Sequence, residues 1–411
     1  MRLVLPLIVL ALLPGCEALQ DELTDNYFIK LQPGVANVGA TVSDLGGAFG
    51  IEPIFVFDRT GGGFTARIPG VLVPVIEDSS DVVEWVIRDE DREYVPPEDG
   101  EEPDEDLPTD GSPPQGGDRD TPAVFDPTEI TPGIARIGGP YPYLPRLEGV
   151  EVAVLDTGVA ANHPDLNVVG YYDAVGQRTG RVVDGEDPQG HGTHVAGTIG
   201  ALADGKGVLG VAPGVPIHAV RVLDDRGSGT WGDIIAGLEY VLDNPAIRVV
   251  NMSLGGPRSG NDARDPLRLA IQRVVDTGVV VVIAAGNEAQ DVSNVAPAGY
   301  DIGLIVSAYD ASRGDNGFAS FSNFGGAIDV TAPGVSINST WPGGGYRNLS
   351  GTSMAAPHVA GVAAAALAAN PDLTPDEVFN LIVSTSEDGF QGQGNRHPEG
   401  MANLPRAIGD E

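Results

Sequence analysis

Residues 247–288 read IRVVNMSLGGPRSGNDARDPLRLAIQRVVDTGVVVVIAAGNE, and this stretch contains the pattern of a strand, a helix and a second strand. Its two ends are nearly continuous apolar runs, whereas residues 266–278 place apolar side chains at helical spacing. A strand that is apolar on both faces must be covered on both faces. This is typical of a parallel sheet whose strands are joined through helices.

The same alternation extends over most of the chain. Further strands are predicted at 149–158, 215–224, 302–310 and 327–334, and further helices at 191–202, 230–244 and from Ser353 onward. We therefore predict an α/β fold for residues 121–411, with a doubly wound, mostly parallel sheet and helices on both faces.

The preceding part of the chain has a different composition. Residues 16–88 combine strand patterns with a short helix pattern and predict a small α+β domain. Residues 89–120 are rich in acids, Pro and Gly, and such a segment cannot bury enough apolar surface to offset the entropy of ordering. We interpret it as a disordered linker, with calcium binding by its acids as a less favoured alternative.

The N-terminus reads MRLVLPLIVLALLPGC and contains the only cysteine of the chain, Cys16, so no intramolecular disulfide can form. The apolar run is too short to span a bilayer and is typical of a signal peptide over residues 1–15. LLPGC resembles a bacterial lipobox, which predicts lipidation of Cys16, a membrane anchor on the precursor and export to the cell envelope. An ordinary secretion signal is the alternative.

The formal net charge of the chain is −35. This charge argues against a nucleic-acid partner and against charge-driven binding to anionic lipid.

Four polar residues stand where parallel strands end or helices begin: Asp156, His191, Asn287 and Ser353. Because ligands of doubly wound sheets gather at the carboxyl edge, we expect these side chains to lie close together. A hydroxyl, an imidazole base, a carboxylate that orients the base and an amide donor for an oxyanion make a set for acyl transfer. Ser353 also has a simpler interpretation, as the N-cap of the alanine-rich helix.

Five motifs favour a Ser353 that is both a helix-start residue and the nucleophile. VAVLDTGV, HGTHVAGTIGA and GTSMAAPHVAG resemble the three active-site motifs of the subtilisin-like serine proteases, in the family order Asp, His, Ser, and NMSLGG and AAGNE resemble its substrate-strand and oxyanion motifs. The resemblance covers residues 121–405. It implies a serine endopeptidase that acts through an acyl-enzyme with catalytic Asp156, His191 and Ser353 and oxyanion donor Asn287, without a cofactor for the chemistry. A monomer that cleaves extended polypeptides is expected.

The resemblance also implies binding residues. An extended substrate would pair with a strand formed by Ser253, Leu254 and Gly255 and would be bordered on its other side by Ser228 and Gly229. The wall of the main specificity pocket would be formed by Ala284, Ala285 and Gly286. Glu288 matches the mouth of that pocket, where it would favour a basic or polar side chain. A solvated surface acid is the equal alternative.

A calcium site is a further expectation. Its ligands would be the carboxylates of Asp165 and Asp204 and the carbonyls of Leu202, Lys206 and Val208. The alternative is two surface acids. The remaining histidines of these motifs, His163, His194 and His358, are expected to be structural.

Residues 16–88 resemble, more loosely, the inhibitory propeptide of the family. This implies a self-processing zymogen whose inhibitory tail lies near residues 87–94, and release of the catalytic domain from the lipid anchor on cleavage. An unrelated α+β domain is the alternative. Two other functions stay open, a non-catalytic peptide-binding relic of the fold and a dedicated processing protease instead of a broad degrader.

Overall fold

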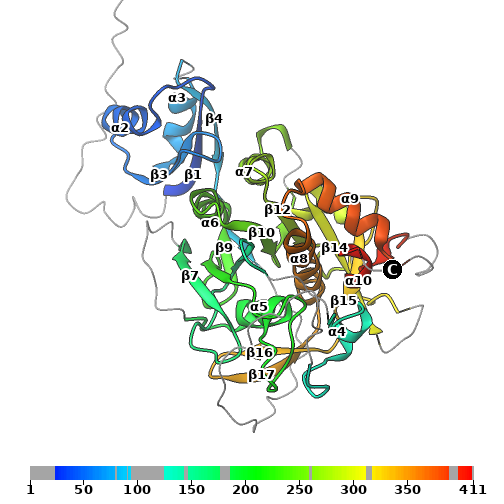
Figure 1. The fold of residues 1–411 in the computed structure, drawn as a ribbon. Helices are drawn as coiled ribbons and strands as arrows, with labels where there is room; N and C mark the ends of the chain where they lie inside the picture. The colour runs from blue at the N-terminus through cyan, green and yellow to red at the C-terminus, as the bar shows by residue number, and fades with distance from the viewer. Residues whose placement is uncertain are drawn as a thin grey trace, which may run out of the picture. The chain divides into compact units, whose positions relative to one another are not determined.

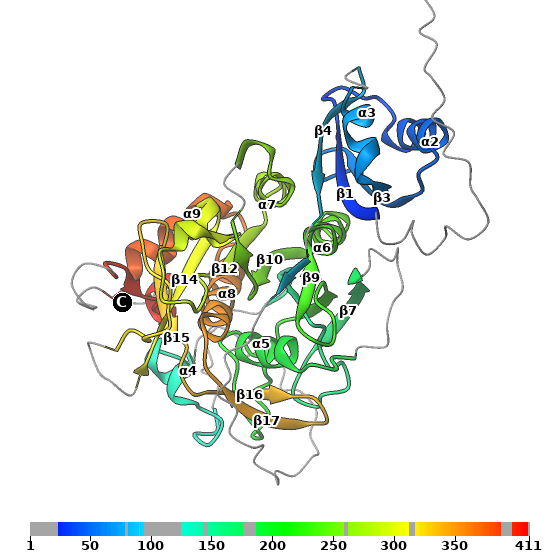
Figure 2. The ribbon, with the colours of Figure 1, turned by 180° about the vertical axis from the view of Figure 1, so that it is seen from behind.

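The computed structural model describes residues 24–78, 81–89, 91–93, 125–142, 147–175, 186–258, 262–311, 317–387 and 397–409. The predicted signal peptide, Cys16 and most of the predicted linker lie outside these residues. By their contacts the described residues divide into two units (Figures 1 and 2). The smaller unit comprises residues up to Val56 and Gly62–Asp89, and the larger comprises Phe57–Gly61 and Glu90–Glu411.

The smaller unit is an antiparallel sheet with two helices. Its strands follow the order β2-β3-β1-β4, and α2 begins at an Asn37 cap and ends at Gly50 in the left-handed region (φ 68°). Val42 and Leu45 of α2 pack with the sheet in one apolar core. The elements are β1 (Thr24–Leu31), α2 (Val38–Phe49), β2 (Pro53–Phe57), β3 (Gly63–Pro69), η1 (Gly70–Leu72), α3 (Val73–Glu77) and β4 (Val83–Arg88).

The larger unit contains an eight-stranded sheet in the order β18-β15-β14-β12-β10-β6-β8-β7, and each of its strand pairs is parallel. The doubly wound α/β prediction is therefore confirmed. The strands are β6 (Glu151–Asp156), β7 (Val168–Asp173), β8 (Ile217–Arg221), β10 (Ile247–Met252), β12 (Val280–Ala284), β14 (Leu304–Tyr309), β15 (Val330–Pro333) and β18 (Gly400–Met401).

Alternate strand residues separate the two faces of this sheet. Val152 and Val154 of β6 share one core with α5 and α8, whereas Leu155 faces α6, where Gly237 lies against it. The helices α5 and α8 contact each other, as do α6 and α7. The helices of the larger unit are α4 (Pro132–Arg136), α5 (His191–Gly200), α6 (Trp231–Asp243), α7 (Pro266–Asp276), α8 (Thr352–Ala369), α9 (Pro375–Thr385) and α10 (Leu404–Ala407).

Several short elements lie outside the eight-stranded sheet. The pairs β5–β9, β11–β13 and β16–β17 are each antiparallel. These pieces are β5 (Asp91–Glu93), β9 (Ser228–Thr230), β11 (Gly256–Pro257), η3 (Asp262–Arg264), η4 (Val292–Asn294), β13 (Val295–Ala296), η5 (Ala298–Tyr300), β16 (Ile337–Trp341) and β17 (Gly345–Leu349).

Candidate active site

An acid and an imidazole meet where β6 ends and α5 begins. Asp156 is the last residue of β6, His191 is the first residue of α5, and both side chains are buried. Nδ1 of His191 donates to the Asp156 carboxylate, at 2.8 Å from Oδ1 and 2.9 Å from Oδ2. Because the carboxylate accepts only, the proton of the neutral ring sits on Nδ1, and Nε2 is then the basic nitrogen.

Asp187 anchors the start of α5, and the sequence analysis did not single it out. Its Oδ1 accepts from the Thr157 hydroxyl and the Gly190 N–H, both at 2.8 Å. Its Oδ2 accepts from the N–H and the hydroxyl of Thr193, at 2.8 and 2.7 Å. A carboxylate at a helix N-terminus accepts hydrogen bonds from N–H groups that have no partner within the helix, and its negative charge interacts favourably with the helix dipole. Asp187 thus fixes the segment that carries His191.

Ser353 is the second residue of α8, and its expected role as N-cap is wrong. The helix begins at Thr352 and its N-cap is Gly351, which forms no side-chain cap bond. The Ser353 hydroxyl instead donates to the Ser253 carbonyl at 3.4 Å, and the Ser253 hydroxyl donates to the Ser353 carbonyl at 2.9 Å. The Ser353 side chain is buried among residues of the carboxyl edge and contributes nothing to capping.

Asn287 lies just after β12 and is oriented by Thr352, another residue that the sequence analysis missed. Asn287 Oδ1 accepts from the Thr352 N–H at 2.8 Å and from the Thr352 hydroxyl at 3.0 Å. The same hydroxyl accepts from the Gly286 N–H at 3.0 Å. Since the amide oxygen is engaged by two donors, the Asn287 side chain presents its NH₂ group as a donor next to α8.

Two strand edges border the predicted substrate path. Backbone residues 91–93 of β5 pair with β9, in the register Arg92 opposite Gly229, and β5 also contacts β11. A small hollow opens between the edges, and the predicted residues Gly229, Leu254 and Gly255 line it together with Trp231, Ile234 and Pro297, which were not predicted. Thr230 ends β9 and caps α6 in a reciprocal pair with Asp233 at 3.1 Å, which fixes this edge to the helix.

Glu288 is exposed, and its carboxylate is held by Asn323. Asn323 Nδ2 donates to Glu288 Oε2 at 2.7 Å and to the Ala285 carbonyl at 2.9 Å, while Asn323 Oδ1 accepts from the Glu288 N–H at 3.1 Å. The acid therefore lies beside the predicted pocket wall, in which Ala284 and Ala285 are buried and Gly286 follows.

Acidic side chains gather at the loop of the expected calcium site. Asp165 Oδ1 accepts from the Leu202 N–H at 2.9 Å, and its Oδ2 accepts from the Tyr346 hydroxyl at 3.1 Å. Burial raises the pKa of Asp165 to about 8, and the negative charge of Asp204 adds to the rise. Glu129, which was not predicted, accepts at Oε1 from the N–H groups of Gly205 and Lys206, both at 2.7 Å.

Two oxygens of this loop stand out. Glu129 Oε2 and Asp204 Oδ1 are buried and have no hydrogen-bond partner in the described part of the chain, and the Lys206 ammonium group is in the same situation. Within those residues, no group of three or more His, Cys, Asp or Glu side chains is arranged to hold a metal. A cation here would need backbone carbonyls among its ligands, as the sequence analysis expected.

The remaining histidines of the motifs are structural, as expected. His194 Nε2 bonds to the carbonyls of Ile337 and Arg347, both at 2.9 Å, and His358 Nδ1 donates to the Met354 carbonyl at 2.8 Å. Burial lowers the pKa of His194 to about 3 and that of His358 to about 4. His163 Nε2 bonds to the Gly345 carbonyl at 3.0 Å. Their neutral rings therefore serve packing and hydrogen bonding.

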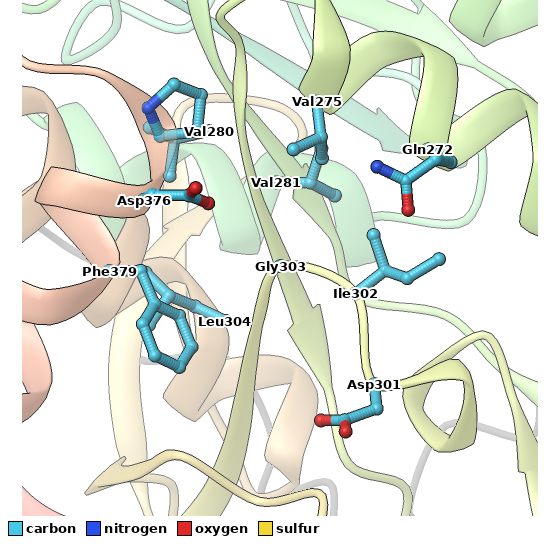
Figure 3. Close-up of a pocket in the computed structure, with 11 residues that line it drawn as sticks. Gln272, Val275, Val280, Val281, Asp301, Ile302, Gly303, Leu304, Asp376 and Phe379 are labelled. Carbon is cyan, nitrogen blue, oxygen red and sulfur yellow. The ribbon is translucent and has the colours of Figure 1, made fainter.

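Another hollow, of about 260 Å³, lies at the amino ends of β12 and β14, away from the carboxyl edge (Figure 3). Its walls combine apolar side chains, such as Val275 and Phe379 from two helices, with polar groups, among them the acids Asp301 and Asp376. It contains none of the predicted site residues.

Comparisons with known proteins agree with this geometry. Residues 148–402 match the model of the "Subtilase family". Subtilisin DY of Bacillus licheniformis is 43% identical over 262 residues, covering 63% of this chain and 90% of that protein. Subtilisin E of Bacillus subtilis (strain 168) is 44% identical over 281 residues, covering 67% of this chain and 70% of that protein. The crystal structure of a cold adapted subtilisin-like serine proteinase matches with a TM-score of 0.58 and 38% identity, covering 67% of this chain and 98% of that chain.

Proposed function

Because the chain belongs to the subtilase family and is a serine endopeptidase, we propose that Asp156, His191 and Ser353 carry out the hydrolysis and that the protein is made as a self-processing precursor. The observation that supports this role most directly is the His191–Asp156 pair at the carboxyl edge, where α5 packs against α8. Ser353 stands in the first turn of α8.

The proposed reaction has two halves. The Ser353 hydroxyl attacks the carbonyl carbon of the scissile bond, and its proton passes to His191 Nε2 while Asp156 stabilises the imidazolium. The C–N bond then breaks, the imidazolium gives the proton to the leaving amine, and an acyl-enzyme remains. Water attacks this ester with His191 again as base, which releases the acid and restores the serine.

The oxyanion of each tetrahedral intermediate needs donors that are already in place. The Asn287 NH₂ group is suited to this role because Thr352 holds the amide oxygen away from it. The Ser353 N–H is a second donor of the right kind, since it lies in the first turn of α8, where the helix dipole favours negative charge.

We place an extended peptide between β9 and β11, paired through its backbone. The pairing of β5 with β9 supports this placement, because residues 91–93 follow the smaller unit along the chain and run along the edge expected to bind substrate. The small hollow that Trp231 and Ile234 line lies along this path. Glu288 would favour a basic or polar residue before the scissile bond.

The same pairing supports the propeptide proposal. In the precursor, β5 occupies the substrate edge and inhibits the enzyme, and the bond that is cut lies shortly after Glu93. The turn of residues 57–61 is a second element of this inhibition. The N–H groups of Arg59 and Thr60 donate to Glu239 Oε1 of α6, at 3.1 and 2.6 Å.

We further propose that the precursor is exported and anchored by lipid on Cys16. Since that cysteine would belong to the removed segment, maturation would release the catalytic part from the membrane. The support is the LLPGC pattern of residues 12–16. Several acyl-chain methylenes, at about 0.8 kcal/mol each, would make the anchor of the uncut chain stable.

A structural calcium ion is part of the proposal. The buried, unpartnered oxygens Glu129 Oε2 and Asp204 Oδ1 fit the ligand chemistry of a hard cation, as does the buried carboxylate of Asp165. The carboxylates of Asp165 and Asp204, with the carbonyls of Leu202, Lys206 and Val208, would hold the ion. Its charge would offset the mutual repulsion of the carboxylates.

The experiment compares the parent with Ser353→Ala in membrane and soluble fractions, with N-terminal sequencing and fluorophosphonate labelling. We expect the parent to react with the probe, to begin shortly after Glu93 and to be soluble. Ser353→Ala should stay uncut, unlabelled and membrane-bound. If the parent protein does not react with the fluorophosphonate probe, the alternative of a non-catalytic peptide-binding protein is supported. A mature N-terminus before Asp91 would contradict the assignment of residues 91–93 to the inhibitory tail.

A further inference from the structure

The hairpin β16–β17 packs against the helix that carries His191 and leads along the chain into the helix that carries Ser353. Strand β16 packs against α5, and β17 ends at Leu349, four residues before Ser353. A displacement of this hairpin would therefore change the placement of the base relative to the nucleophile.

Hydrogen bonds fix the hairpin along α5. The hydroxyl of Ser339 donates to the His194 carbonyl at 2.6 Å, and the hydroxyl of Thr340 donates to the Thr193 carbonyl at 2.8 Å. The ring of His194 reaches both strands, since its Nε2 lies 2.9 Å from the carbonyls of Ile337 and Arg347. Both partners are acceptors, so Nε2 carries the proton.

Trp341 contacts the residue that starts α5. A Cβ atom on Gly190 would collide with the six-membered ring of Trp341, so the backbone of Gly190 lies directly against that ring. Gly190 has φ 97° and immediately precedes His191. The guanidinium of Arg347 lies over the Trp341 ring, 4.6 Å from its centroid, in a cation–π contact.

We infer that Trp341 is a positioning residue for His191. Arg347 holds the Trp341 ring, the ring fixes the backbone of Gly190, and Gly190 in turn fixes the position of the His191 imidazole relative to Ser353. This inference rests on the proposed catalytic roles of His191 and Ser353. A base that has moved by about 1 Å can cost up to about 100-fold in rate, whereas substrate contacts elsewhere stay intact. Loss of the ring should therefore lower kcat more than it changes KM.

The test uses mature enzyme with Trp341→Leu, Trp341→Phe and Asn338→Ala, matured by added parent enzyme if a variant cannot process itself. Asn338 lies in the same strand, is partly buried and makes no hydrogen bond to α5 in the described structure. We expect Trp341→Leu to lower kcat and the fluorophosphonate labelling rate by roughly 10- to 100-fold, with KM nearly unchanged. Trp341→Phe, which keeps a flat ring under Arg347, should recover most of the loss, and Asn338→Ala should match the parent.

A second measurement separates misplacement of His191 from loss of the fold. In the Ser353→Ala background, the low-field NMR signal of the His191 Nδ1 proton should shift on Trp341→Leu and stay unchanged on Asn338→Ala. Parental kcat and an unshifted proton in Trp341→Leu would overturn the inference, and so would equal losses in the Leu and Phe variants. If Ser353→Ala itself kept parental activity, the proposed function would fail first.

Discussion

The buried ring of His358 makes the stability of this protein depend on pH in a way that one substitution isolates. The side chain is fully buried in α8, and its Nδ1 donates to the Met354 carbonyl at 2.8 Å. Its Nε2 is buried without a hydrogen-bond partner among the described residues. A second proton on this ring would place a charge in the core with nothing to solvate it.

The magnitude follows from two pKa values. Burial lowers the pKa of His358 from 6.5 to about 4, and the bond to the Met354 carbonyl opposes this only in part. Between these pH values the unfolded chain binds more protons, so the free energy of unfolding falls as the pH falls from 6.5 towards 4. At about 1.4 kcal/mol for each pH unit, His358 should account for a loss on the order of 3 kcal/mol.

The assay is urea unfolding of the full-length chain between pH 4.5 and 7.5, in the Ser353→Ala background to prevent self-digestion. The substitution is His358→Asn, because an amide can still donate to the Met354 carbonyl but does not titrate in this range. We expect the variant to be less stable near pH 7.5 and the difference to narrow steadily on acidification. His194 titrates in both proteins, and the charge of His358 is the smallest of the causes that shift the pKa of His194, so its contribution nearly cancels in the comparison. Two stability curves that run parallel over the whole range would refute the reasoning.

Three further predictions concern the site and its loop. Asn287→Ala should lower kcat by about 10²–10³ with little change in KM; this range comes from a subtilisin, a member of the same family. Steady-state kinetics in which only KM rises and kcat is unchanged would contradict the oxyanion role. Glu288→Ala should reduce cleavage after Lys and Arg in a peptide library relative to cleavage after Leu. An unchanged cleavage profile would show that Glu288 is a solvated surface acid without a role in specificity. Chelation of calcium should lower the melting temperature of Ser353→Ala but not of Ser353→Ala/Asp165→Asn/Asp204→Asn, and equal melting curves with and without chelator in the first protein would exclude the ion.

The alternation of apolar strands and helices was sufficient to predict the parallel sheet and the edge at which Asp156 meets His191. This succeeds because burial on both faces demands continuous Val, Ile and Ala, and because parallel strands bring their carboxyl ends to one edge. Both signals are local in the chain. The same patterns missed β7, whose six residues are mostly only half-buried and form no continuous apolar run, and β18, which at two residues has no periodicity to read.

Contacts between distant residues carry no such local signal. The capping interpretation of Ser353 was chemically sound for its neighbours in sequence, yet its hydroxyl turns to Ser253, one hundred residues away. The orientation of Asn287 by Thr352, the support of α5 by Asp187 and the contact of Trp341 with Gly190 likewise exist only once the chain has folded. Hydrogen bonds and packing act over a few ångströms in space, so only the folded arrangement of the elements specifies which side chains they join.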